Sequence, residues 1–230
     1  MRQRAVPTQR LPVALQPIWD TNGVLLGHEY LYRSRSGRPA GVDGWAAARQ
    51  DEASASVLRT VFGGTGLGGT VFGGTVFGRT TPGSAISAGN GARTSAALAF
   101  VNVTRSFLIR ERPLPPPNRR LVLEVVETVP ADVGVLLGLR RLRAGGYRIA
   151  VDDYTASADQ LAMLPFADFV KVDCRDLPRL PAGALDDARA FGARLVAERV
   201  ADTGLVSYVT DLGFESLQGD ALGAASTRAG

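Results

Sequence analysis

The chain has 230 residues, enough for one α/β domain, and its 45% hydrophobic and 21% charged content is ordinary for a globular protein. No hydrophobic run approaches the roughly 20 residues of a membrane span, and the basic start Met1–Arg4 is not followed by the hydrophobic stretch of about 7–15 residues that a secretion signal needs. The net charge of +4 comes from scattered arginines without an aromatic-rich basic stripe, which argues against a nucleic-acid polymer as partner.

Cys174 is the only cysteine, so it cannot form an internal disulfide bond. A chain without disulfide bonds is typical of the reducing cytosol, and we therefore expect a cytoplasmic protein. We interpret Cys174 as a small packing residue rather than as a nucleophile.

The N-terminal part of the chain predicts a strand hairpin. We expect residues 1–12 to be a disordered tail, followed by strands over Val13–Trp19 and Leu25–Tyr32. The Asn-Gly pair that ends Asp20–Gly23 is a strong signal for the hairpin turn between them. A helix is predicted over Ala46–Leu58.

Residues 60–93 predict a low-complexity, glycine-rich insertion, because Thr-Val-Phe-Gly-Gly and its variants recur there at short spacing. Gly64–Gly69 formally matches the G-x-G-x-x-G pattern of a dinucleotide-binding turn. That pattern needs a preceding strand and a following helix, and neither is predicted here. We therefore reject a nucleotide site at this place.

From Ala97 onward, hydrophobic strands alternate with amphipathic helices. The predicted strands are Ala97–Val103, Leu121–Val126, Tyr147–Val151, Phe169–Val172, Arg194–Ala197 and Glu215–Leu217. The predicted helices are Ala131–Ala144, Ala158–Leu164, Ala184–Ala193 and Ala201–Leu212. This alternation favours parallel strands with crossover helices. We predict an α/β fold, a TIM-like (β/α) barrel with an antiparallel N-terminal strand hairpin, over residues 13–220, and a C-terminal tail over residues 221–230.

Lys171 is the only lysine among 26 basic residues, and it lies inside a hydrophobic strand. An ammonium is a compact charge with three rotatable donors, whereas a guanidinium is a rigid planar fork. A lysine in a chain that otherwise uses arginine therefore indicates a site that needs an ammonium. A chance leftover at a strand end is the alternative.

The predicted strands carry polar residues at the ends where they would converge on one rim of a barrel. These residues are Glu29, Asn102, Glu124, Asp152 with Asp153, Lys171 with Asp173, Glu198 and Gln218. Several carboxylates and an amide at one rim favour a divalent cation, and oxygen ligands favour Mg²⁺ or Mn²⁺ over zinc. For any single carboxylate a helix cap or an ion pair with arginine is the simpler interpretation, and for Asp153 and Asp173 it stays open.

This constellation resembles the EAL domain, a bacterial phosphodiesterase family that acts on cyclic di-GMP. Glu29–Arg33 resembles the Glu-Ala-Leu-x-Arg signature, with Tyr30 in place of alanine. The other similar segments, in the family's order, are Gln16–Ile18, Phe100–Val103, Leu123–Glu127, Val151–Tyr154, Lys171–Asp173, Ala197–Val200 and Gln218–Gly219. Details of these segments look closest to the divergent branch that is usually fused to an HDOD domain.

The resemblance implies a two-cation site of Mg²⁺ or Mn²⁺ and roles for individual residues. The metal ligands would be Glu29, Asn102, Glu124, Asp152 and Asp153. Lys171 and Glu198 would be catalytic, with Lys171 holding the attacking water or offsetting phosphate charge. Gln16, Arg33 and Gln218 would bind the substrate, Arg33 as a clamp on a phosphate oxygen.

Two departures from the family affect the expected activity. Tyr154–Gln160 contains no glycine where active members have a glycine-rich turn, and Arg199 replaces a glycine. We therefore prefer a degenerate module of cyclic di-GMP signalling that binds cyclic di-GMP or a partner protein, such as a second copy of itself. The alternative is a working metal-dependent phosphodiesterase that yields the linear dinucleotide, and a decayed copy is a third interpretation.

Overall fold

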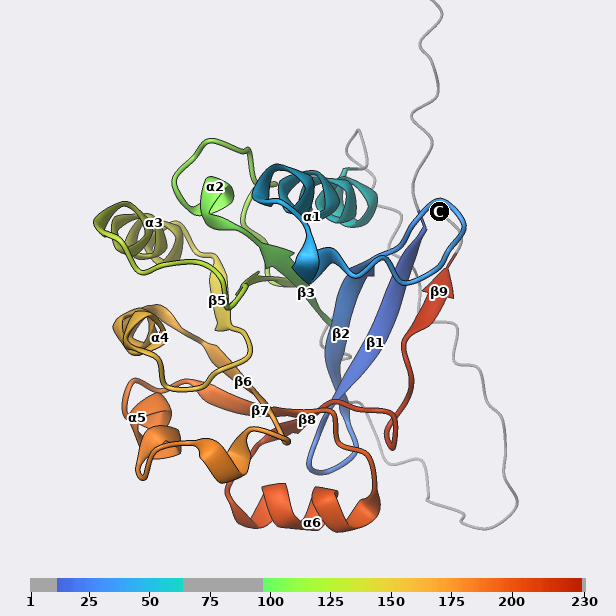
Figure 1. Ribbon diagram of the computed structural model, residues 1–230, viewed down its shortest axis with the longest axis vertical. Helices are drawn as coiled ribbons and strands as arrows, with labels where there is room; N and C mark the ends of the chain where they lie inside the picture. Colours follow the sequence, from blue (N-terminus) through green and yellow to red (C-terminus); the bar gives the residue numbers. More distant parts are fainter. Residues whose placement is uncertain (1–11, 64–96, 229–230) are drawn as a thin grey trace, which may run out of the picture.

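The computed structural model describes residues 12–63 and 97–228, and within them the strands form a closed barrel with helices around it (Figure 1). The strands are β1 (Val13–Asp20), β2 (Leu25–Tyr32), β3 (Leu98–Val103), β4 (Leu121–Val125), β5 (Arg148–Val151), β6 (Phe169–Asp173), β7 (Arg194–Glu198), β8 (Ser216–Leu217) and β9 (Ser226–Arg228). The sheet order is β2-β3-β4-β5-β6-β7-β8-β1, and the pairing of β1 with β2 closes the ring. This confirms the predicted TIM-like barrel.

The helices lie between successive strands, as the alternation predicts. They are α1 (Ala47–Phe62), α2 (Arg105–Leu108), α3 (Val133–Ala144), α4 (Ala158–Met163), α5 (Ala184–Ala190) and α6 (Thr203–Asp211). Short 3-10 turns occupy η1 (Val42–Gly44), η2 (Leu164–Phe166) and η3 (Leu177–Arg179). No helix in the described ranges is both long enough and hydrophobic enough to cross a bilayer.

The hairpin inserts one antiparallel strand into an otherwise parallel barrel. β1 pairs antiparallel with β2 and with β8, whereas β2 to β8 are parallel neighbours in order. Asp20 Oδ1 accepts hydrogen bonds from the amides of Asn22 (2.9 Å) and Val24 (2.8 Å), and Gly23 has φ +76°. The predicted Asn-Gly turn is therefore present, and the register sets Gln16 opposite Glu29.

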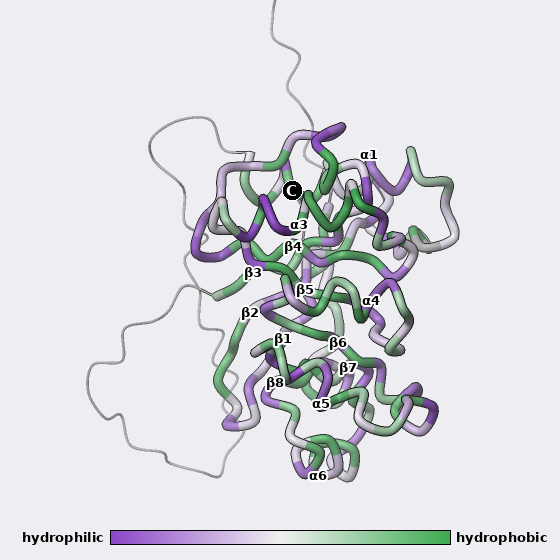
Figure 2. Tube along the Cα trace, turned by 90° about the vertical axis from the view of Figure 1, so that its left-hand side faces the viewer, coloured by the Kyte–Doolittle hydropathy of each residue, from purple (hydrophilic) through white to green (hydrophobic). Residues whose placement is uncertain are grey.

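Successive side chains of a strand point to opposite faces of the sheet, and this places the hydrophobic residues in two layers. One is a buried plug inside the barrel, made by Ile18, Phe100, Val122, Ala150, Phe169 and Val196. The rings of Phe100 and Phe169 meet edge to face, 5.1 Å apart, across the barrel from β3 to β6. The larger layer lies between strands and helices, and Figure 2 shows hydrophobic residues running along the strands.

The structure also differs from the predicted elements at several ends. Helix α1 continues to Phe62, into the first residues of the range 60–93; residues 64–93, like residues 1–11, lie outside the described part. Strand β9 falls in the range 221–230, where we expected only a tail, and pairs with Val13–Leu15. Neither β9 nor the four-residue α2 was predicted, because both are too short to show a hydrophobic period.

Candidate metal site at the mouth of the barrel

The polar residues of the site lie directly above the hydrophobic plug. Side chains two positions apart in a strand point to the same face. Five strands carry a plug residue two positions before a polar residue: Phe100 and Asn102, Val122 and Glu124, Ala150 and Asp152, Phe169 and Lys171, Val196 and Glu198. All five polar side chains therefore point into the barrel at the carboxyl-terminal end of their strands, where barrel enzymes hold their active sites.

Lys171 lies at the centre of this group, with its side chain 1% exposed. Its Nζ is 3.3 Å from Glu29 Oε2, 3.2 Å from Asp152 Oδ1 and 2.7 Å from Glu198 Oε1. It also donates a short hydrogen bond to Glu124 Oε1. Residues from β2, β4, β6 and β7 and from the end of β5 thus meet around one ammonium.

Gln16 and Gln218 are connected to the carboxylate group through Glu29. Gln218 Nε2 donates to Glu29 Oε2 (2.6 Å) and to Gln16 Oε1 (3.1 Å). The chain after β8 packs directly against the backbone of Val200. Residue 219 must be a glycine for this approach, because a Cβ there would lie 2.3 Å from the backbone N and O of Val200. Gln218, itself bound to Gln16, therefore orients the Glu29 carboxylate.

Several buried oxygens of the group lack a hydrogen-bond partner within the described part of the chain. They include Asn102 Oδ1, Glu124 Oε2 and Gln218 Oε1. A buried polar atom without a partner costs about 1–3 kcal/mol, so such atoms need an explanation. They are all acceptors, which a cation would satisfy.

The charges of the group are also unbalanced. Burial raises the pKa of Glu124 well above its usual value, against the opposing effect of Lys171. Burial likewise raises the pKa of Glu198 to about 8, again opposed by Lys171. Burial favours the neutral form of Lys171, but the surrounding carboxylates outweigh it and raise the pKa of the ammonium. These raised pKa values mean that the group holds protons which one ammonium does not replace, and a bound cation would favour their release.

A second acidic group adjoins the first. Oxygens of Glu127, Asp152 and Asp153 lie within 4.8 Å of one another, a spacing suitable for a metal ion. Asp153 has φ +42°, and burial, followed by the charge of Asp152, raises its pKa to about 6. Glu127 is not among the ligands that the sequence predicts, although the family-like segment Leu123–Glu127 ends on it.

The donors of both groups suit a hard divalent cation. They are carboxylate oxygens and one amide oxygen, and Mg²⁺, Mn²⁺ and Ca²⁺ prefer such ligands. The partnerless oxygens of Asn102 and Glu124 show that hydrogen bonding within the described chain leaves ligand positions open. The residues present therefore fit the metal site that the sequence predicts.

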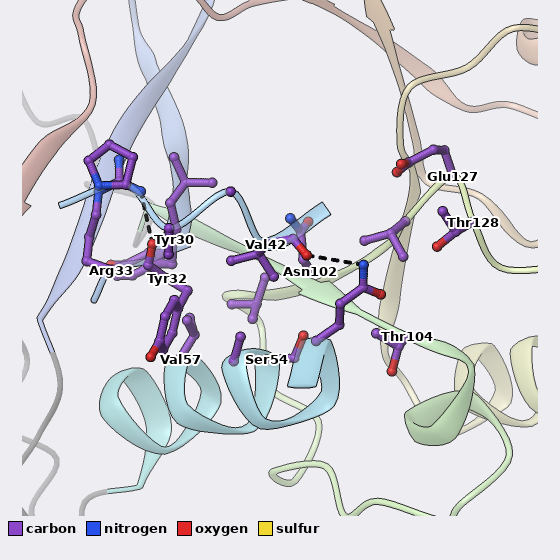
Figure 3. Close-up of a pocket in the computed structure, with 18 of the residues that line it drawn as sticks. Tyr30, Tyr32, Arg33, Val42, Ser54, Val57, Asn102, Thr104, Glu127 and Thr128 are labelled. Carbon is purple, nitrogen blue, oxygen red and sulfur yellow. Dashed lines mark hydrogen bonds between the residues drawn. The ribbon is translucent and has the colours of Figure 1, made fainter. Parts of the chain in front are cut away.

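A hollow of about 610 Å³ opens above these residues. Glu29, Asn102, Asp152, Lys171, Glu198 and Gln218 line it, with Arg175 and Arg199. It shares Asn102, Glu127 and Arg199 with a neighbouring hollow of about 380 Å³, in which Arg33 and Tyr32 lie at one end and Glu127 and Thr128 at the other (Figure 3). Arg33 donates to the carbonyl of Tyr32 (3.0 Å) and thus lies in the adjoining hollow rather than among the carboxylates.

Asp173 does not join the group around Lys171. Its Oδ2 lies 2.5 Å from Arg175 Nη2 and 2.8 Å from Arg199 Nε. These two arginines keep the pKa of Asp173 low although burial raises it. The ion-pair interpretation that the sequence left open for Asp173 is therefore the one that the geometry supports.

The chain is similar to one protein family and to several known proteins. The model of the EAL domain family matches residues 97–225. Over 143 residues the chain is 29% identical to the cyclic di-GMP phosphodiesterase CdgJ of Vibrio cholerae, covering 58% of this chain and 32% of that protein. Over 218 residues it is 22% identical to the uncharacterized protein YuxH of Bacillus subtilis, covering 91% and 46%. The chain thus spans from about a third to just under half of these relatives' lengths.

Solved structures agree with this context at the level of the fold. The manganese and cyclic di-GMP complex of Klebsiella pneumoniae BlrP1 has a TM-score of 0.66 at 19% identity, over 97% of this chain and 57% of that one. The Bacillus subtilis YkuI protein, with an EAL domain and in complex with cyclic di-GMP and calcium, has a TM-score of 0.63 at 19% identity, over 94% and 54%.

Proposed function

Since the chain belongs to the EAL domain family, we propose that it binds cyclic di-GMP with divalent cations at the barrel mouth and hydrolyses it to the linear dinucleotide. The convergence of Glu29, Glu124, Asp152 and Glu198 on one ammonium, beside partnerless acceptors, carries this proposal. The cyclic di-GMP phosphodiesterase CdgJ and the two cyclic di-GMP complexes support the choice of ligand.

In this proposal the two acidic groups hold two cations, Mg²⁺ or Mn²⁺. Glu29, Asn102, Glu124 and Asp152 would hold the first. Asp152 and Asp153 would hold the second, with Glu127 beside them. When bound, such cations supply Lewis-acid polarisation of a phosphodiester and lower the pKa of a coordinated water.

The chain's own residues would position the phosphate and hold protons around it. Lys171 is buried among the ligands, where its ammonium would donate to a phosphate oxygen and offset its charge. Glu198 accepts from Lys171 at 2.7 Å and thereby fixes the direction of the Nζ donors. Arg33, at the far end of the adjoining hollow, would clamp a second phosphate oxygen with its planar fork.

A second candidate function is binding without turnover, and Arg199 is the observation that favours it. Its side chain is 64% exposed, lines both hollows, and stands beside the site on a backbone with φ +53°. Arg199 pairs with Asp173 at the edge of both hollows, where its positive charge would weaken the binding of a divalent ion by repulsion. In this case the protein would act by recruiting the nucleotide or a partner protein.

One assay separates the two functions. The purified protein is incubated with cyclic di-GMP and Mn²⁺ or Mg²⁺, and the linear product is separated by chromatography. Glu29→Gln removes a ligand charge without changing size, and Glu111→Gln, an exposed glutamate outside both hollows, is the matched control. Product formation that Glu29→Gln abolishes and Glu111→Gln retains supports the enzyme. Nucleotide binding without product supports the binding module. The absence of both product and nucleotide binding contradicts the enzyme and the nucleotide-binding module, and favours protein interaction or a decayed copy.

A further inference from the structure

The segment that follows β5 folds around one buried side chain, Gln160, which is 5% exposed. Its Nε2 donates to the carbonyls of Asp153 (2.9 Å) and Asp152 (3.2 Å). Its Oε1 accepts from the amide of Thr155 (2.9 Å), from the Thr155 hydroxyl (3.2 Å) and from the amide of Ser157 (3.3 Å). The amide thus uses both its donors and its acceptor on the backbone or side chains of this one segment.

This segment holds a backbone that its sequence disfavours. Asp153 has φ +42° and Ala156 has φ +61°, although the segment contains no glycine. A residue other than glycine in this region costs about 1–3 kcal/mol and persists only where surrounding contacts enforce it. Tyr154 supplies contacts from one side, because its amide donates to the carbonyl of Lys171 (2.9 Å) and its hydroxyl to that of Ala184 (3.2 Å). Gln160 supplies them from the other.

The contacts of Gln160 reach the two residues that carry the adjacent carboxylates. Asp152 and Asp153 receive the two Nε2 hydrogen bonds on their carbonyls, and their carboxylates lie beside Glu127. Without these two bonds, Asp153 would lose contacts that hold its positive φ and thereby fix its carboxylate beside Asp152. The side-chain amide thus does here what a glycine-rich turn does by conformational freedom.

We propose that Gln160 is a positioning residue that holds Asp153 in the left-handed conformation and so sets the second cation position. This inference deepens the proposed function and rests on it for the identity of the ligand. The competing role is a helix cap only, because Ser157 and Gln160 also form a reciprocal capping box at the start of α4.

Three variants separate positioning from capping. Gln160→Glu keeps the acceptor of the capping box but loses the donors to Asp152 and Asp153. Gln160→Met loses both without adding charge. Ser157→Ala removes the hydroxyl that accepts a hydrogen bond from the backbone N–H of Gln160, and it leaves the Gln160 side chain in place.

The first measurement is Mn²⁺ binding to the full chain by calorimetry. Wild type and Ser157→Ala are expected to bind two ions, whereas Gln160→Glu and Gln160→Met bind the second at least tenfold more weakly, the usual effect of losing a residue that orients a ligand. Equal weakening in Ser157→Ala, or wild-type binding in Gln160→Met, overturns the proposal.

Amide hydrogen exchange over residues 152–157 without metal keeps this test separate from the proposed function. Faster exchange in both Gln160 variants than in Ser157→Ala is expected. Unchanged exchange overturns the positioning role even if the wild type hydrolyses cyclic di-GMP. Faster exchange in a protein that binds neither ion nor nucleotide leaves the positioning of Asp153 standing and contradicts the proposed function alone.

Discussion

Lys171 shows why one residue type is required at one position. Its ammonium faces carboxylates from several directions, and three rotatable donors suit this geometry better than a planar guanidinium. The sequence indicates this residue, because it is the only lysine in an arginine-rich chain. The sequence did not indicate Glu127, since the side chain of a residue beyond a strand end takes its direction from the loop.

Lys171→Met tests the electrostatic role of the ammonium. The change leaves buried carboxylates without their counter-charge, and removing one partner of a buried ion pair costs about 3–5 kcal/mol. We expect the free energy of unfolding to fall by at least about 3 kcal/mol, and Mn²⁺ to raise the Tm more in the variant than in wild type. Arg179→Met, which breaks an exposed pair with Asp176, is the control and should change stability by under about 1 kcal/mol. Equal stability of Lys171→Met and wild type would refute the arrangement.

Substitutions of Arg199 test whether the backbone beside the site is strained. Its φ of +53° disfavours any side chain with a Cβ, and Arg199→Ala and Arg199→Gly both lose the ion pair with Asp173. Only the glycine variant relieves the strain, so chemical denaturation should show it more stable than the alanine variant by about 1 kcal/mol. Two variants of equal stability would show that no strain is stored there. Turnover that appears in both variants but not in the wild type would indicate that the arginine side chain obstructs the site.

At the scale of elements, short loops decide which strand-end residues meet. The period of the strands predicts which side chains point inward, and the order of strands and helices is readable from hydrophobic spacing. Hydrophobic spacing does not predict the conformation of the loop after β5, because that conformation depends on the hydrogen bonds of Gln160. Tyr154–Gln160 contains no glycine where the family has a glycine-rich turn, yet the side-chain contacts of Gln160 form an ordered turn there.

Substitution of Gly219 tests how closely the loop after β8 packs against the loop after β7. A Cβ at this position would lie 2.3 Å from the backbone of Val200, so Gly219→Ala must displace the chain next to Glu198. We expect a loss of about 1–3 kcal/mol in the free energy of unfolding, together with weaker Mn²⁺ binding. The control is Gly44→Ala, where a Cβ meets nothing within 4 Å. A Gly219→Ala variant as stable as the control would contradict this close approach.

At the scale of the whole molecule, closure of the barrel joins the two ends of the chain at one site. Gln218 binds Gln16, 202 positions away, because β1 lies between β2 and β8. The sequence predicts this closure through the hairpin and the repeated βα units. It does not predict the place of Arg33 in the adjoining hollow, which depends on how β2 leaves the barrel. The extent of the domain, residues 13–220, stays a prediction.

Side chains from separate strands thus form the proposed cation site at the mouth of the barrel. Crystals grown with Mn²⁺ and cyclic di-GMP, measured at the manganese absorption edge, test this arrangement. We expect one anomalous peak bounded by Glu29, Asn102, Glu124 and Asp152, and a second beside Asp153. Nucleotide bound elsewhere, or no peak among these carboxylates at saturating Mn²⁺, would contradict it.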